Sequence, residues 1–213
     1  MRRVRVVGVW VAVVSVLSVP GAPPAFAATQ WHVVNFALGL PPGAARDATT
    51  VADARAAITE VDRFYQAISH GRIRFRAGKI VTWRRSQAAC TTSTVARTAR
   101  RLNIRLDLRH HMVEYQPVDC GFAGLGSRPG PLVVLGRGAT SSALAHELGH
   151  NLGLGHSNAS RCSVAFQRAC PPGEDYHLAD EYGDDSDVMG GSDLRTTEKL
   201  NPPAVAPRAL GPL

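Results

Sequence analysis

The hydrophobic and polar positions of the chain follow two periods, and each period predicts a different kind of element. Apolar and polar residues alternate over residues 31–36, which predicts a strand. Over residues 51–68 the apolar side chains recur every three or four positions, as on one face of a helix. Thr50 and Asp53 have the spacing of an N-terminal capping box, and Gly71 provides a stop signal. The first two elements are therefore predicted to be a strand and a long helix.

Later segments continue this succession of strands and helices as far as Gly153, after which few segments are periodic. Such an order predicts an α+β fold in which helices pack on a mixed sheet. The third helix is expected to begin at Ala143, with Ser141 or Ser142 as its cap. The other predicted elements are strands at residues 72–77, 80–83, 112–116 and 132–135 and a helix at residues 94–102.

The start of the chain has the pattern of a secretory signal. Three arginines fall within the first five residues, and an apolar run over residues 6–19 follows them. Small residues two apart, at positions 25 and 27, then form a cleavage site. The apolar run is too short for a membrane anchor, which needs roughly 20 residues. Residues 1–27 are therefore predicted to be removed, and the remaining chain, residues 28–213, is expected to be secreted as a single domain.

Composition and charge exclude some classes of protein. The chain is 45% hydrophobic and 19% charged, which is typical of a globular protein and not of a disordered one. Removing the predicted signal takes away three arginines and no acids, so the net charge falls from +7 to about +4. The basic residues are concentrated in residues 28–140. Because Arg72, Arg74 and Arg76 alternate with apolar residues, as on a strand with one solvent-exposed face, no nucleic-acid partner is expected.

An exported chain with an even number of cysteines is expected to form disulfides. Cys90, Cys120, Cys162 and Cys170 allow three pairings. The sequential pairing closes the shortest loops, so Cys90–Cys120 and Cys162–Cys170 are the expected bonds. Zinc ligation by cysteine would require pairs spaced two to four residues apart, and no such pair exists.

The segment from His146 to His156 carries the most informative spacing. His146 and His150 are four residues apart, so on a helix their side chains share a face and can bind one metal ion. Gly153 suits a sharp turn that brings His156 back as a third ligand. Three imidazoles leave a fourth position for water, as in a catalytic zinc site. Glu147 can reach that water without being a ligand itself.

This segment resembles the zinc motif of the metzincin metalloproteases, in which a methionine turn follows the third histidine. Here Met189 stands 33 residues after His156. Within the metzincins, the chain is similar to the gametolysin family. The residues that carry this narrower likeness are 34–36, 64–65, 69–73, 120–124, 156–157, 181–184 and 188–190.

The resemblance implies a particular arrangement of one catalytic domain. An upper subdomain (about residues 28–153) would hold a twisted mixed sheet and two long helices, the metal-binding helix included. A mostly irregular lower subdomain (about residues 154–213) would hold His156 and the methionine turn. Met189 would pack beneath the three histidines as an apolar floor.

The function expected from these features is that of a secreted zinc endopeptidase. Glu147 would activate a zinc-bound water, and a protein or peptide substrate would bind in extended form. The strand at residues 132–135 lies just before the metal helix and is expected to pair with that substrate. We expect a monomer without stable membrane association. Two alternatives keep the zinc but change the role: an amidase that acts on a wall polymer, and a binding or inhibitory module.

Two further groups of residues are expected to have no role in catalysis. A cluster of acids could bind calcium, but a solvated loop is the favoured interpretation. The remaining histidines of interest are expected on the surface or in loops. The acids are Asp180, Glu181, Asp184, Asp185 and Asp187, and the histidines are His32, His110, His111 and His177.

Overall fold

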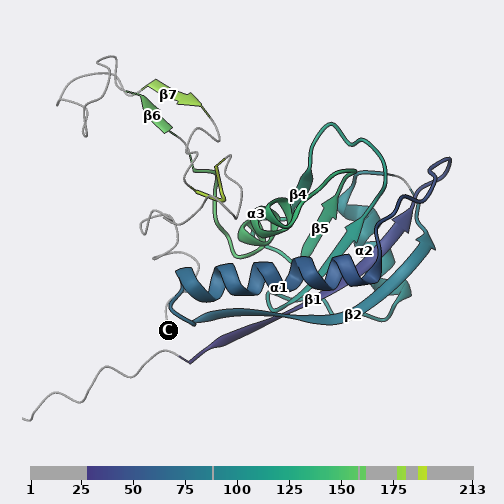
Figure 1. Cartoon of the computed structure of the whole chain (residues 1–213), viewed down its shortest axis with the longest axis horizontal. Helices are drawn as coiled ribbons and strands as arrows, with labels where there is room; N and C mark the ends of the chain where they lie inside the picture. Colours follow the sequence, from purple (N-terminus) through teal and green to yellow (C-terminus); the bar gives the residue numbers. More distant parts are fainter. Residues whose placement is uncertain (1–27, 88, 158, 162–176, 181–186, 191–213) are drawn as a thin grey trace, which may run out of the picture.

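A computed structural model describes residues 28–87, 89–157, 159–161, 177–180 and 187–190. Its centre is a five-stranded mixed sheet in the order β2-β1-β3-β5-β4, in which β4 alone runs antiparallel to its neighbour (Figure 1). A separate two-stranded sheet pairs β6 with β7. The strands are β1 (Gln30–Leu40), β2 (Ile73–Arg85), β3 (His110–Tyr115), β4 (Gly124–Gly126), β5 (Leu132–Leu135), β6 (Ala159–Arg161) and β7 (His177–Asp180).

Three helices cover the two faces of the five-stranded sheet. They are α1 (Val51–Ile68), α2 (Thr92–Arg101) and α3 (Ser141–Asn151). Apolar side chains of α1 and α3 form one core with the first face, and α2 forms a smaller core with the opposite face. The prediction of two long helices is wrong in one respect. α1 has 18 residues, but α3, the helix of the histidine motif, ends after 11 residues because the chain turns at Gly153.

The first helix confirms its sequence signals. The Thr50 side chain accepts a hydrogen bond from the backbone N–H of Asp53, and the Asp53 carboxylate accepts one from the backbone N–H of Thr50. The buried side chains of α1 follow the predicted stripe. Gly71 has a φ of +79°, and its N–H closes the helix on the carbonyl of Gln66.

Two local expectations are corrected by the structure. The strands expected on either side of Gly78 are one continuous strand, β2, whose pairing with β1 shifts register near this glycine. A methyl group at Gly78 would lie 2.6 Å from Oδ1 of Asn35, which accepts from the N–H of Lys79. The cap of α3 is Thr140, and not Ser141 or Ser142, since its hydroxyl accepts from the N–H of Ala143.

One of the two expected disulfides is confirmed. Cys90 and Cys120 are bonded, which ties the segment before α2 to the loop that leads into β4. Cys162, Cys170 and the predicted signal lie outside the described residues. Within the described part of the chain, no helix is long and apolar enough to cross a membrane.

Candidate metal centre

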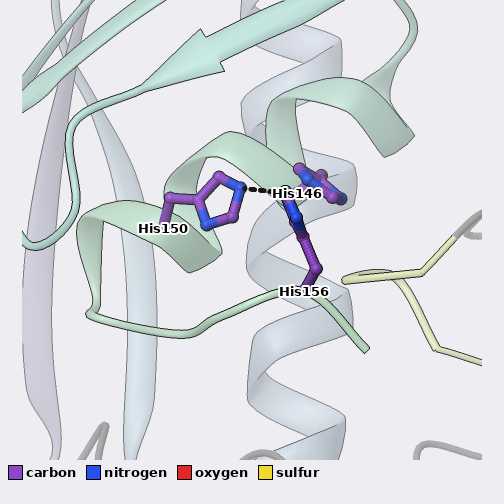
Figure 2. Close-up of side chains that lie close together, drawn as sticks. All are labelled: His146, His150 and His156. Carbon is purple, nitrogen blue, oxygen red and sulfur yellow. Dashed lines mark hydrogen bonds between the residues drawn. The ribbon is translucent and has the colours of Figure 1, made fainter. Parts of the chain in front are cut away.

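The three motif histidines converge at the C-terminal end of α3 (Figure 2). His146 and His150 project from neighbouring turns of the helix. The helix then stops at Gly153, whose φ of +97° is readily adopted by glycine, and the returning chain presents His156. One nitrogen from each ring can be chosen so that all three lie within 4.8 Å of one another.

Backbone carbonyls fix the orientation of two of these rings. Nδ1 of His146 lies 2.8 Å from the carbonyl oxygen of Val188, and Nδ1 of His150 lies 2.9 Å from that of Leu154. Because a carbonyl can only accept, each neutral ring carries its proton on Nδ1 and keeps a lone pair on Nε2. Nε2 of His150 is 3.0 Å from Nε2 of His156, so two ring nitrogens face each other closely.

This set of donors fits a zinc ion. Burial lowers the pKa of His150 to about 4 and also lowers the pKa of His146, so both rings are neutral near pH 7 and can donate lone pairs. Neutral imidazoles are preferred zinc ligands, and three of them form the protein's share of many catalytic zinc sites. The carbonyls on Nδ1 are the kind of supporting contact that orients metal-bound histidines.

Glu147 lies beside the histidines and is almost fully buried, with 6% of its surface exposed. Burial raises the pKa of its carboxyl group to about 7, and a backbone hydrogen bond from Gly126 acts in the opposite direction. The carboxyl group lines a pocket of about 300 Å³ together with the three histidines. The other lining residues are Gly124, Leu125, Gly126 and Arg128. A carboxyl group, three imidazoles and an open space therefore meet at one place.

Met189 packs against α3 at Gly149. It is 1% exposed, and a methyl group at Gly149 would lie 2.4 Å from its sulfur and 2.8 Å from the hydroxyl oxygen of Tyr65. The Tyr65 hydroxyl donates to the carbonyl of Ala145. Burial raises the pKa of Tyr65, and the charge of Asp187 adds to that shift. Gly149, in the last turn of α3, thus permits the close approach of both side chains.

Asp187 is a buried structural residue and not part of a solvated loop. It is 1% exposed, and its carboxylate accepts from the hydroxyl of Ser157 at 2.6 Å and from the N–H of Met189 at 2.9 Å. The N–H of Ser157 in turn donates to the carbonyl of Met189. These bonds fasten the residue after His156 to the methionine turn. Among the other acids of the cluster, Glu181, Asp184 and Asp185 lie outside the described residues, and Asp180 ends β7.

The expectation that His32 and His111 are surface residues is wrong. They are 4% and 0% exposed, and Nδ1 of His32 lies 2.9 Å from Nε2 of His111. Nδ1 of His111 is 3.0 Å from Oδ1 of Asn151, whose amide nitrogen donates to the carbonyls of Ser127 and Leu132. The pair thus supports Asn151, the last residue of α3, which holds the loop between β4 and β5. The alternation along the predicted strands could have shown that both histidines are buried, since they continue the buried faces of these strands.

The other two histidines of this group, His110 and His177, lie outside the motif cluster. His110 is half-buried, and its Nδ1 lies 2.8 Å from the carboxylate of Asp107. His177 begins β7.

The strand expected to receive a substrate is not free. β5 pairs with β3 on one side and with β4 on the other, so both of its edges are occupied. The outer strand beside the histidine cluster is β4, which sequence reasoning missed because Gly-Leu-Gly has neither alternation nor β-forming residues. A peptide that extends the sheet at this side would therefore pair with β4.

A second and larger cavity, of about 410 Å³, opens between the N-terminal ends of α1 and α3. Its lining is mainly apolar and includes Phe36, Tyr115, Leu135 and Leu144. It contains none of the motif histidines, so we place the chemistry in the smaller pocket.

Comparisons with known proteins give distant likenesses. No protein-family model matches the sequence, and no curated protein matches it. Among solved structures, the chain is similar to archaemetzincin from Methanopyrus kandleri, with 16% identity, a TM-score of 0.38 and coverage of 84% of this chain and 90% of that one. It is also similar to metalloproteinase-II from Bacteroides fragilis, with 18% identity, a TM-score of 0.36 and coverage of 61% and 45%. Identities and TM-scores this low assign neither a family nor a function to the chain.

Proposed function

We propose that the protein is a zinc-dependent peptidase whose active site is the histidine cluster. The observation that carries this proposal is the convergence of His146, His150 and His156 beside the buried carboxyl group of Glu147. A structural zinc site would have four protein ligands, whereas the described residues bring three imidazoles and an open pocket. The arrangement is that of a hydrolytic centre.

Each group has a distinct part in the proposed reaction. Zinc, when held by the three imidazoles, supplies a Lewis acid that polarises the scissile carbonyl and lowers the pKa of water to roughly 7. Glu147 accepts the proton of the attacking water and returns it to the leaving amine. The outer edge of β4, which pairs with no other described strand, binds the peptide in extended form through main-chain hydrogen bonds.

The finer assignment is to a secreted endopeptidase of the gametolysin type. The signal pattern of residues 1–27 supports secretion, and the Cys90–Cys120 disulfide is consistent with an oxidising compartment. The motif and the position of Met189 support a metzincin-like site, with the substrate cleft between the upper and lower subdomains. We propose one catalytic zinc, no required calcium and a monomeric enzyme.

The test is hydrolysis of casein by the secreted protein, with and without a chelator, followed by zinc add-back. We expect cleavage that the chelator abolishes and zinc restores, with new N-termini inside the substrate chain. Release of amino groups from a purified wall polymer, with casein left intact, would instead favour the amidase. Tight zinc binding with neither activity would favour the binding module.

A further inference from the structure

The strand β4 lies directly against Glu147, and its two glycines make this approach possible. A methyl group at Gly124 would lie 2.6 Å from Cγ of Glu147 and 2.8 Å from Oε1. One at Gly126 would lie 2.7 Å from the backbone carbonyl oxygen of Glu147 and 3.0 Å from Oε2. Real side-chain atoms do not approach so closely, so the carboxyl group occupies the space that side chains on this strand would fill.

The backbone of β4 does not itself require glycine. Neither Gly124 nor Gly126 lies in the left-handed region of φ, in contrast to Gly121 at +72°. Glycine weakens a strand interior because it has no side chain to pack and loses more entropy on folding. Two glycines in a three-residue strand therefore indicate a close approach by another group, and Glu147 is that group.

The two positions differ in what an added methyl group would displace. At Gly124 the nearest atoms all belong to the Glu147 side chain, which can move aside by rotating. At Gly126 the nearest atom is a backbone oxygen of α3, which can move only if the helix or the strand shifts. Leu125, between them, is 44% exposed and points away from this contact.

We propose that Gly124 is a positioning residue for Glu147. Because glycine has no side chain, the carboxyl group of Glu147 can occupy this space, and the position of the carboxyl group in the pocket depends on it. The proposal rests on the proposed function, in which Glu147 is the base. A displacement of the carboxyl group leaves the three histidines in place, so it should impair proton transfer without removing the metal. Gly126 has a complementary part, since its N–H donates to the carboxylate.

The kinetic test compares Gly124→Ala with the control Leu108→Ala, at an exposed leucine outside the pocket, on one peptide substrate. For Gly124→Ala we expect full zinc content, a KM within about threefold of the wild type and a kcat lower by roughly 10- to 100-fold, as for an active-site group misplaced by about 1 Å. Leu108→Ala keeps the wild-type kcat, because Leu108 is exposed and lies outside the pocket that Glu147 lines. A Gly124→Ala variant with wild-type kcat would overturn the proposal.

A stability test examines the same contact without any assay of activity. Tm is measured for the wild type, Gly124→Ala, Glu147→Ala and the double variant, which together form a double-mutant cycle. We expect Gly124→Ala to lower the Tm of the wild type by a few degrees, and to leave it unchanged or raise it when the Glu147 side chain is gone. Equal effects in both backgrounds would show that the two residues are not coupled and would overturn the packing claim.

The two tests separate failure of the proposal from failure of the proposed function. If the wild type hydrolyses no peptide, the proposed function is wrong. The double-mutant cycle of Tm values then decides alone whether Gly124 positions Glu147. If the wild type is active and the cycle shows no coupling, the function stands and the positioning role does not.

Discussion

The buried histidine pair makes the stability of the fold depend on pH. His32 is 4% exposed, and burial, together with the charges of His111 and Arg109, lowers its pKa to about 4. In the unfolded chain the same group has its ordinary pKa of about 6.5. The folded state therefore favours the neutral ring, and between these two values the unfolded state binds more protons. The stabilisation is complete above about pH 6.5 and is lost as the pH falls toward 4.

The magnitude follows from the two pKa values of His32. At pH 5 the protonation of His32 in the unfolded chain lowers the free energy of unfolding by about 2 kcal/mol. The matched variant is His32→Asn, because the asparagine amide can still donate to Nε2 of His111 but cannot be protonated. The wild type should therefore lose about 2 kcal/mol more unfolding free energy than His32→Asn between pH 8 and pH 5.

The assay is urea denaturation at several pH values in the presence of a chelator, so that release of zinc does not contribute. The slopes with urea should agree between the two proteins, which makes the midpoints comparable. If the wild type and His32→Asn lose the same unfolding free energy over this range, His32 does not titrate as a buried neutral group and the reasoning is wrong.

Three further variants test other parts of the site. His156→Ala should lower both activity and zinc content, since two imidazoles remain, and full zinc occupancy by elemental analysis would show that another residue is the third ligand. Gly149→Ala should destabilise the fold by about 1–3 kcal/mol through its contact with Met189, as measured by urea denaturation, and an unchanged midpoint would contradict that packing. Asn151→Ala should cost about 1–3 kcal/mol by the same measurement, because the ring N–H of the buried His111 loses its acceptor and the Ser127 carbonyl loses the Asn151 amide, and an unchanged midpoint would contradict these contacts.

Much of the fold follows from local signals in the sequence. The helical period and the Thr50–Asp53 box predict α1, since both depend only on residues a few positions apart. The spacing of His146, His150 and Gly153 likewise predicts that the three rings converge, because a helix and one sharp turn are enough to bring them together.

The contacts that depend on tertiary packing could not be predicted in this way. β4 pairs with β5 and its glycines let it approach Glu147, a contact that joins residues more than twenty positions apart. The bonds from Asp187 to Ser157 and from His111 to Asn151 span still longer distances along the chain. Periodicity shows which face of an element is buried, but it does not show which group lies opposite.

The central claim is that Glu147 acts as the base beside a zinc ion held by three histidines. Its most direct test measures zinc content and peptide hydrolysis together in the wild type and in Glu147→Gln. We expect one zinc per chain in both proteins and a loss of hydrolysis of at least about 100-fold in the variant, because the ligands remain and the base is gone. A variant that hydrolyses peptides at the wild-type rate, or an active wild type without zinc, would contradict the account.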